Sequence, residues 1–335
     1  MKAVIPAAGE GTRLYPQTHT KPKAMVRLAG KPILGHLLDQ LLDTTIDEAV
    51  IVVGSQKGSQ IVEYATEAYG TRLDLSFPEQ TVPRGLGHGV YQARDAVGDE
   101  PMLVVLGDML FVEGYDPFIT AHRSAGADVT IGVHEVDDPT RYGVVELGDG
   151  WAISHLVEKP ADPPSNYAIS GLYGIEDSPA LFAALESLIT DDDRGTGGEF
   201  QLTDAFQRLV ADGRDVRAHP VSDWYDCGRA EPLLEVNRVL LDRRSVDDSQ
   251  GDDGTLVIPP VDIGRDVVIE SSIVGPYASV DHGTTIINSI VRDSIVGRNV
   301  DLDGVNIERS LLGDDATISD DPATLNVGSN GSLEL

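Results

Sequence analysis

Small residues and basic residues follow one another near the N-terminus in an order suited to holding a polyphosphate. The segment Ala7–Arg13 (AAGEGTR) comes after a predicted strand at Lys2–Ala7, and Lys21, Lys23 and Lys31 come soon after it. Glycine and alanine let main-chain N–H groups approach a phosphate closely, while arginine and lysine supply countercharge. The pattern therefore predicts a phosphate loop followed by its cationic partners.

Lysine is rare in the rest of the chain, which favours a functional role for the lysines at these positions. The sequence holds only six lysines, while aspartate and glutamate together number 55 and the formal net charge is -30. Three of the six lie between positions 21 and 31, directly after the glycine-rich loop. A solvated basic patch is the alternative, but a chain this poor in lysine is expected to keep the residue where it binds something.

Composition limits the kinds of protein that this chain can be. A length of 335 residues predicts two domains, and 41% hydrophobic residues suffice to bury a core in each. Strong acidity, with arginine in excess of lysine, is typical of adaptation to high salt, which screens the self-repulsion of such a charge. The absence of a basic stripe argues against nucleic acid as a partner.

Cysteine usage and hydropathy exclude further classes. Cys227 is the single cysteine, so an internal disulfide framework and a multi-cysteine zinc site are ruled out. No apolar run reaches membrane-spanning length, and the start MKAVIPAAG is too short and glycine-interrupted for a signal peptide. We therefore expect a soluble, cytoplasmic protein with no membrane partner.

Short apolar runs alternate with amphipathic, helix-like segments from Met1 to about Leu241. This alternation favours an α/β fold with a mostly parallel sheet covered on both faces. Ligands of such sheets gather at the carboxyl ends of the strands, where the Gly9 loop and the turn after Leu106 are placed. The expected strands are Lys2–Ala7, Glu48–Val53, Leu73–Phe77, Met102–Leu106, Asp128–His134, Gly143–Leu147, Tyr167–Ile175 and Val216–Pro220. The expected helices include Pro32–Asp43, Leu86–Val97, Ser178–Ile189 and Gln201–Ala211.

The character of the sequence changes after an acidic stretch. Residues 242–254 are polar, acidic and glycine-containing, which is typical of a linker between a first domain at 1–241 and a second at 255–335. In the second domain β-branched pairs recur at intervals of about six residues, and the SIVG of Ser272–Gly275 returns at Ser294–Gly297. Such hexapeptide repetition predicts a small parallel β-helix with a C-terminal tail, a sandwich being the alternative.

Seven motifs of the first domain occur in the order found in one enzyme family. From Met1 to about Leu241 the chain resembles the nucleoside-diphosphate-sugar pyrophosphorylases, which are sugar-1-phosphate nucleotidyltransferases, and particularly the glucose-1-phosphate thymidylyltransferase type. The repeats resemble the left-handed β-helix on the longer members. The motifs are AAGEGTRLYPQTHTKPKA, LGD at Leu106–Asp108, YGVVE at Tyr142–Glu146, EKP at Glu158–Pro160, SNYAISGLY at Ser165–Tyr173, EFQLTD at Glu199–Asp204 and WYDCG at Trp224–Gly228.

The resemblance implies a Rossmann-like nucleotidyltransferase domain. Its reaction would move a nucleotidyl group from dTTP or UTP to a hexose-1-phosphate, above all glucose-1-phosphate, with release of pyrophosphate and with Mg²⁺ as cofactor. Carried onto this sequence, the family's catalytic pair is Arg13 and Lys23, and its Mg²⁺ ligands are Asp108 and Asp226. The implied nucleotide-binding residues are Ala8, Gly9, Gly11, Thr12, Gln80 and Gly85. The implied sugar-phosphate-binding residues are Gly143, Glu158, Lys159, Asn166, Gly171 and Tyr173.

The residue types suit these roles. Two anions must be aligned and their charge offset, which cations and main-chain amides achieve without a protein nucleophile. Gln80 presents a donor and an acceptor together, as the shared base edge of thymine and uracil requires, so dTTP and UTP both stay open. A dinucleotide-binding fingerprint would need its third glycine at Leu14, which excludes a dehydrogenase. Arg194 suits a phosphate contact and an ordinary surface position equally well.

Three positions depart from the family pattern. Arg27 replaces a proline, Pro6 replaces an aliphatic residue, and Met109 stands where many thymidylyltransferases carry asparagine. Met109 cannot make the hydrogen bonds of that asparagine, which weakens the sugar assignment more than the reaction assignment. The histidines show no metal-ligand spacing and are interpreted as structural or surface residues.

Two other functions stay open. One is a bifunctional enzyme whose β-helix also acetylates an amino-sugar-1-phosphate, with His282 as the histidine of the repeats that could act as base. The other is a non-catalytic sugar-nucleotide sensor, against which the joint presence of the catalytic and metal residues argues. For the nucleotidyltransferase we expect a homo-oligomer that serves cell-surface polysaccharide or glycoprotein glycan synthesis.

Overall fold

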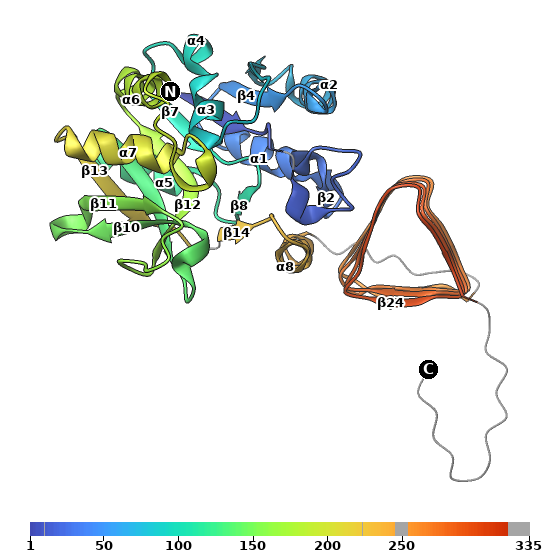
Figure 1. Ribbon diagram of the computed structural model, residues 1–335. Helices are drawn as coiled ribbons and strands as arrows, with labels where there is room; N and C mark the ends of the chain where they lie inside the picture. Colours follow the sequence, from blue (N-terminus) through green and yellow to red (C-terminus); the bar gives the residue numbers. More distant parts are fainter. Residues whose placement is uncertain (10, 223, 245–253, 321–335) are drawn as a thin grey trace. The chain divides into compact units, whose positions relative to one another are not determined.

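The computed structural model describes residues 1–9, 11–222, 224–244 and 254–320 (Figure 1). Two compact units make up the chain: Met1–Val26 with Lys31–Leu233, and Arg27–Gly30 with the residues from Leu234 onward. Most of the predicted linker, at 245–253, and the predicted tail from 321 lie outside the described residues. Within the described ranges, no helix combines the length and the apolar character that a bilayer crossing needs.

The central strands of the first unit are parallel, as predicted. Strand β1 (Lys2–Pro6) hydrogen-bonds in parallel to β4 (Glu48–Gly54) on one side and to β7 (Met102–Val105) on the other. Their apolar side chains are buried on both faces of the sheet, as a parallel sheet covered by helices requires. Strands β5 (Asp74–Ser76) and β6 (Glu79–Gln80) extend this half by pairing in parallel with β4.

Antiparallel pairs occur in the other half of the same sheet, so the sheet as a whole is mixed and mostly parallel, in agreement with the prediction. Strand β12 (Tyr167–Ile175) runs antiparallel to β7 and to β9 (Val129–Glu135). Strands β10 (Gly143–Leu147) and β11 (Ile153–Glu158) form a hairpin, because their short connection is too brief for a crossover. Strand β13 (Val216–Pro220) closes this edge in parallel with β9.

Amphipathic helices pack on the sheet of the first unit (Figure 1). The predicted helix at Leu86–Val97 is two short helices, α3 (Leu86–Tyr91) and α4 (Arg94–Val97). The carboxylate of Asp177 begins α6 by accepting the Ala180 N–H. The other α-helices are α1 (Ile33–Leu42), α2 (Gly58–Tyr69), α5 (Asp116–Ala125), α6 (Ser178–Thr190) and α7 (Leu202–Ala211). The 3₁₀ helices are η1 (Thr12–Leu14), η2 (Lys23–Met25), η3 (Pro139–Arg141), η4 (Asp149–Trp151) and η5 (Thr196–Gly198). The remaining short strands are β2 (Arg27–Leu28), β3 (Lys31–Pro32), β8 (Met109–Phe111) and β14 (Trp224–Asp226).

The second unit is a parallel β-helix, as predicted, with a triangular cross-section (Figure 1). Three four-stranded parallel sheets form its sides, and apolar residues stack inside. The repeated SIVG phrases supply Val274 and Val296 to this interior. The first side is β15 (Leu256–Val257), β18 (Ile273–Val274), β21 (Ile290–Arg292) and β24 (Asn306–Glu308). The second is β16 (Val261–Ile263), β19 (Ala278–Val280), β22 (Ile295–Val296) and β25 (Leu311–Leu312). The third is β17 (Val268–Glu270), β20 (Thr285–Ile287), β23 (Asp301–Asp303) and β26 (Thr317–Ser319).

Several loops between these short strands contain a non-glycine residue with a left-handed backbone. Asp266, Asn288, Asp293 and Asn299 have φ values of 57°, 50°, 45° and 52°. Most residues avoid this region, whereas asparagine and aspartate tolerate it because their short polar side chains bond to the local backbone. The geometry of the coils thus explains why these two residue types recur between the strands.

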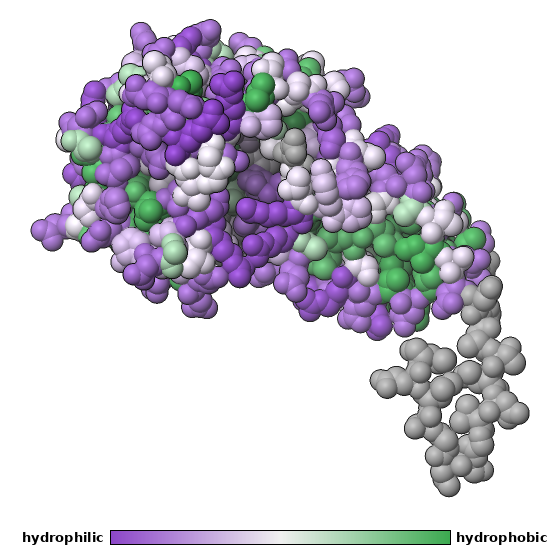
Figure 2. Space-filling view, in the orientation of Figure 1, coloured by the Kyte–Doolittle hydropathy of each residue, from purple (hydrophilic) through white to green (hydrophobic). Residues whose placement is uncertain are grey.

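The two units differ in surface character. On the face shown in Figure 2, hydrophilic side chains dominate the first unit and apolar side chains gather on the second. Leu256 and Val268 of the β-helix are 51% and 45% exposed. Apolar surface that is gathered in this way commonly marks an interaction site.

Arg27, one of the departures from the family pattern, has a partner in the second unit. Its Nε lies 2.9 Å from Oδ2 of Asp281, whose side chain is only 7% exposed. The other carboxylate oxygen accepts the backbone N–H of His282 and lies 2.8 Å from Nδ1 of the same residue. A proline at position 27 would leave this nearly buried carboxylate without the guanidinium. His282 is likewise engaged in a structural contact.

Asn237 joins three segments of the second unit. It lies on helix α8 (Ala230–Asp242) and is 1% exposed. Its Oδ1 accepts the Ala29 N–H at 2.9 Å and the Ser279 hydroxyl at 2.7 Å, while its Nδ2 donates to the Tyr277 carbonyl at 3.3 Å. Both ends of the amide are therefore satisfied, as burial requires.

Replacing Arg27 with methionine is expected to destabilise the protein by about 1–3 kcal/mol, because a nearly buried carboxylate loses its closest cation. Calorimetric melting of the full chain measures the change. Arg94→Met is the matched control, since the Arg94–Asp95 ion pair is exposed and its loss should have a clearly smaller effect on stability. Equal effects of the two substitutions would contradict the role given to Arg27.

Candidate active site

The loops after β1 and β7 meet at the carboxyl ends of these adjacent parallel strands. A cavity of about 570 Å³ opens there. It brings together residues of the predicted phosphate loop, the turn after β7, and the loop that contains the predicted nucleotide-binding residues Gln80 and Gly85, here called the base-reading loop. Of the predicted site residues, its lining includes Ala8, Gly9, Gly11, Thr12, Arg13, Lys23, Gln80, Gly85 and Asp108.

The backbone of the phosphate loop needs glycine at position 11. Gly11 has φ +69°, and a Cβ there would lie 3.1 Å from both Lys23 Cβ and Thr18 Cγ2. Gly9, in contrast, has no atom within 4 Å of the place where a Cβ would stand. The loop begins as an extension of the sheet, because the Ala7 N–H donates to the Val52 carbonyl at 2.8 Å. The small residues Ala8 and Gly9 leave room for a ligand to approach the main chain of the loop.

Lys23 lies between the two predicted metal ligands. Its ammonium forms an ion pair with Asp108 and lies 3.9 Å from Oδ1 of Asp226. Strand pairing makes this possible: in the β8–β14 ladder Asp226 lies opposite Met109, the residue after Asp108. The Gly228 N–H orients the Asp226 carboxylate by donating to it at 2.8 Å. Two acids that are far apart in sequence thus surround one ammonium.

The donor set suits a hard divalent cation. Asp108 and Asp226 offer carboxylate oxygens, the ligands that Mg²⁺ prefers, and Asp108 also lines the cavity. Among the described residues no group of three or more His, Cys, Asp and Glu is arranged to hold a metal ion. The acid pair is consequently suited to a cation whose remaining ligands are phosphate oxygens and water.

Glu158 is held in one orientation by two neighbours. Its Oε2 accepts the Thr203 hydroxyl at 2.7 Å, and its Oε1 lies 3.0 Å from the Lys159 ammonium. A Cβ at Gly143 would lie 3.0 Å from the same Oε2, so this glycine leaves room for the carboxylate. Lys159 takes φ +45° at the end of β11, and its N–H donates to the Tyr142 carbonyl.

Thr203 is absent from the residues predicted to form the site, although it lies within the EFQLTD motif. Its side chain is positioned by the first turn of α7 and reaches a carboxylate on β11. The sequence signal that could have pointed to Thr203 was its place in this motif. The motif alone does not show which of its side chains meets Glu158.

None of the six predicted sugar-phosphate-binding residues, Glu158, Lys159 and Gly143 included, is among the described residues that line the cavity. Gly171 has φ +86°, and a Cβ there would lie 2.8 Å from Leu106, so its role is close packing of β12. Tyr173, predicted to pack or hydrogen-bond in the hexose pocket, is 3% exposed and stacks on Phe206. Burial, followed by the nearby Glu158 and Asp108 carboxylates, raises the pKa of its hydroxyl. Asn166 is exposed, and its carbonyl accepts the Val136 N–H.

Gln80 is buried and already engaged by its neighbours. Its amide nitrogen donates to the Gly85 carbonyl at 3.1 Å and lies 3.0 Å from His88 Nδ1. Both amide hydrogens are used, so the oxygen is the group left to accept from a base N–H. This differs from the expectation that Gln80 offers a donor and an acceptor together. Sequence reasoning also missed His88, which it treated as a structural or surface histidine.

Two cations considered at the sequence level have other partners. Lys31 forms an ion pair with Asp39 at 2.5 Å and does not contribute to the cavity lining. The Arg194 guanidinium lies over the Phe200 ring and donates to Asp192 at 2.8 Å. These contacts favour the surface interpretation of Arg194.

A family model described as nucleotidyl transferase matches residues 2–243. The chain belongs to this family. The Low-salt glycan biosynthesis nucleotidyltransferase Agl11 of Haloferax volcanii is 33% identical, with each chain covered over 100% of its length. A glucose-1-phosphate thymidylyltransferase of Streptomyces griseus is 34% identical, over 96% of this chain and 94% of the relative. The UTP–glucose-1-phosphate uridylyltransferase AglF of Haloferax volcanii is 37% identical, over 72% of this chain and 96% of the relative.

Solved structures agree with this membership. A UDP-glucose pyrophosphorylase complexed with UDP-glucose is 26% identical, covers 72% of this chain and 99% of its own, and has a TM-score of 0.64. The residues that line the cavity, from Pro6 to Gly228, all lie within the range 2–243 that the nucleotidyl transferase family model matches.

Replacing Gly85 with alanine is expected to destabilise this nucleotidyl transferase by about 1–3 kcal/mol more than replacing Gly98. Both glycines have positive φ, but a Cβ at Gly85 would lie 2.7 Å from the Phe200 carbonyl oxygen, whereas Gly98 has open space. Chemical denaturation of both variants measures the difference. A Gly85 variant as stable as the Gly98 variant would show that the base-reading loop tolerates the side chain.

Proposed function

We propose that the protein transfers a nucleotidyl group from dTTP or UTP to a hexose-1-phosphate, preferentially glucose-1-phosphate, and releases pyrophosphate. The observation that carries the proposal is the grouping of Lys23, Asp108 and Asp226 beside a glycine loop. Lys23 and Asp108 line the same cavity as Gln80. The family membership and the printed activities of the relatives support it.

An oxygen of the sugar phosphate attacks the α-phosphorus of the triphosphate. The new P–O bond forms as the bond to the β-phosphate oxygen breaks, and pyrophosphate leaves with that electron pair. No protein nucleophile is needed, so the protein contributes alignment and charge. Main-chain amides of the loop around Gly9 and Gly11 hold the triphosphate, while Arg13 and Lys23 offset the charge that develops.

Asp108 and Asp226 would hold Mg²⁺, which offsets phosphate charge and makes the α-phosphorus more electrophilic when bound. Lys23 lies beside both carboxylates and is therefore placed to contact the same phosphates. These three side chains place one positive and two negative charges near the end of β1, where the two anionic substrates must meet.

The other predicted residues divide between the two substrates. The Gln80 oxygen accepts from the base N–H that thymine and uracil share, so both nucleotides fit the same contact. Glu158, oriented by Thr203, accepts from sugar hydroxyls, and Lys159 contacts the sugar phosphate. Gly143 provides the room that this carboxylate needs.

One relative supports a role for the nucleotide sugar that the enzyme would make, and the surface of the β-helix supports an oligomer. The relative named for low-salt glycan biosynthesis spans this whole chain, which supports nucleotide-sugar supply for glycans as the role. The apolar side chains gathered on the β-helix support a homo-oligomer (Figure 2). Light scattering of the full chain tests the assembly.

The proposal as a whole is tested by pyrophosphate release with each nucleoside triphosphate against a panel of sugar-1-phosphates. We expect turnover with dTTP or UTP and glucose-1-phosphate, dependent on Mg²⁺. Acetyl-CoA consumption measured in parallel detects the acetyltransferase alternative. Absence of pyrophosphate release with every pair of substrates would overturn the proposal.

Asp108→Asn is expected to lower kcat by at least about 100-fold while the protein stays folded, because one charged oxygen ligand is lost. Asp212→Asn is the control, since Asp212 is an exposed aspartate after α7. Pyrophosphate release at saturating substrate and circular dichroism check activity and fold. Near-wild-type turnover of Asp108→Asn would refute the role assigned to this carboxylate.

Acidification is expected to weaken nucleotide binding through His88. Burial, followed by the nearby Arg84, lowers the pKa of His88 below its usual 6.5, so Nδ1 is unprotonated at pH 7 and accepts from the Gln80 amide. The KM for the nucleotide should stay constant above pH 6.5 and rise as the pH falls through the lowered pKa. His88→Gln should remove this rise, and His155→Gln, at an exposed histidine, should retain it.

A further inference from the structure

Lys57 is one of the six lysines of the chain, and the proposed mechanism does not use it. It directly precedes α2, and its ammonium donates to the Thr18 carbonyl at 2.7 Å. Gln60, in the first turn of the same helix, donates to the Thr20 carbonyl at 2.9 Å. The start of α2 thus holds the segment that follows the phosphate loop by two of its carbonyls.

Thr18 passes this constraint to the loop. It is fully buried, and its hydroxyl donates to the Gly11 carbonyl at 2.7 Å. The same carbonyl accepts the Leu14 N–H at 2.9 Å. Because a trans peptide is planar, a carbonyl and the N–H of the next residue point in opposite directions. Fixing the Gly11 carbonyl therefore also fixes the direction of the Thr12 N–H, and both residues line the cavity.

Gly11 is also wedged between Thr18 and Lys23. The place of its missing Cβ lies 3.1 Å from a side-chain carbon of each. A displacement of Thr18 would consequently move Gly11 relative to Lys23, the residue proposed to contact the phosphates. The spacing between loop and lysine depends on where Thr18 is held.

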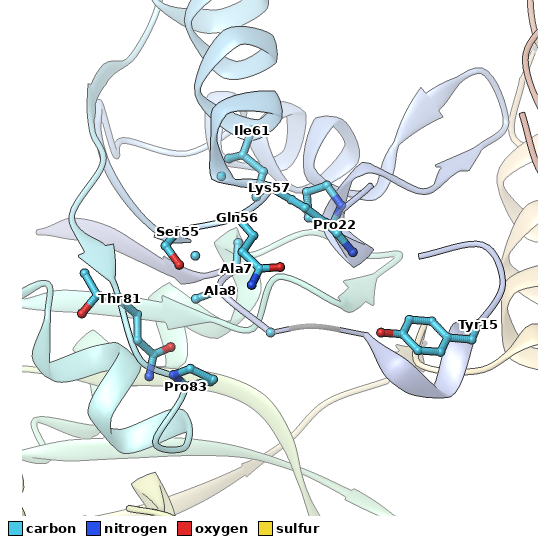
Figure 3. A pocket seen from close by; sticks show the side chains of 14 residues that line it. Ala7, Ala8, Tyr15, Pro22, Ser55, Gln56, Lys57, Ile61, Thr81 and Pro83 are labelled. Atoms are coloured by element: carbon cyan, nitrogen blue, oxygen red, sulfur yellow. The ribbon is translucent and has the colours of Figure 1, made fainter. Parts of the chain in front are cut away.

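A second cavity of about 200 Å³ lies beside the loop, lined by Ala8, Gly9, Lys57 and Gln80 among others. Figure 3 shows Lys57 beside this hollow, with Ala7 and Ala8 across from it. Since a hollow supplies no packing contacts, Ala8 and Gly9 are less constrained on this side, and the position of the loop depends more on the hydrogen bonds that hold its Gly11 carbonyl.

We propose that Lys57 is a positioning residue for the nucleotide: it fixes Thr18, Thr18 fixes the Gly11 carbonyl, and the loop amides are held ready for the triphosphate. The proposal rests on the proposed function, because it assigns the loop to the triphosphate. Arginine is the commoner cation in this chain, and a single compact ammonium suits a lone carbonyl better than a planar fork does.

The test compares the KM values of the two substrates. Lys57→Met should raise the KM for the nucleotide about tenfold, the effect of losing one charged hydrogen bond, and leave the KM for the sugar-1-phosphate unchanged. Thr18→Val should do the same, and Thr18→Ser, which keeps the hydroxyl, should restore the wild-type value. The double variant Lys57→Met/Thr18→Val should raise the KM for the nucleotide no further than the single variant with the larger rise does, because both residues act through one chain of hydrogen bonds.

Lys2→Met is the matched control. The Lys2 ammonium also donates to a backbone carbonyl, that of Ala96 at 3.0 Å, but Lys2 begins β1 whereas the phosphate loop follows its end. This variant should lower stability without changing either KM. An unchanged nucleotide KM in Lys57→Met, or an equal rise for both substrates, overturns the proposal for Lys57. A wild-type protein without turnover would instead overturn the proposed function.

Discussion

The contact between the Lys23 ammonium and two carboxylates is the interaction on which the rest of the site depends. Asp108 and Asp226 would repel each other at this range without a cation between them. The parallel pairing of β1 with β7 brings the loop end of one strand to the aspartate that follows the other. The β8–β14 ladder then delivers the second carboxylate. The sheet, the loop and the ladder thus bring together a single cluster of opposite charges, which is the site proposed for the anionic substrates and their cation.

The parallel half of the sheet, the β-helix and the loop around Gly11 were predictable from the sequence, because each is encoded by a local pattern. Apolar runs predict buried strands, short repeats predict the coils of the β-helix, and small residues before cations predict the phosphate loop. The meeting of Lys23 with Asp108 was predictable for a related reason, since both follow strands that end at one edge of a parallel sheet. Asp226 needed the family resemblance, because no local pattern distinguishes it among so many aspartates.

What could not be predicted depends on contacts between distant segments. The Thr203 hydroxyl reaches Glu158, and His88 occupies an amide hydrogen of Gln80. No periodic pattern in the sequence predicts either contact. The prediction of a mostly parallel sheet was confirmed, but which strands pair in antiparallel could not be assigned, because buried strands of both directions share the same apolar composition. The stacking of Tyr173 on Phe206 likewise joins two distant segments, and the motif that contains Tyr173 does not show it.

The left-handed residues between the strands of the β-helix bear on the acidity of the whole chain. Aspartate and asparagine occupy positions such as Asp266 and Asn299, where glycine would be the usual alternative. A composition shifted toward aspartate therefore supplies the residue that these bends accept, while also adding hydrated negative charge to the surface. In this β-helix, the acidity that high salt favours and the need for a residue that tolerates a left-handed backbone select the same amino acid. A further coil of the β-helix would add both another such bend and more negative surface charge.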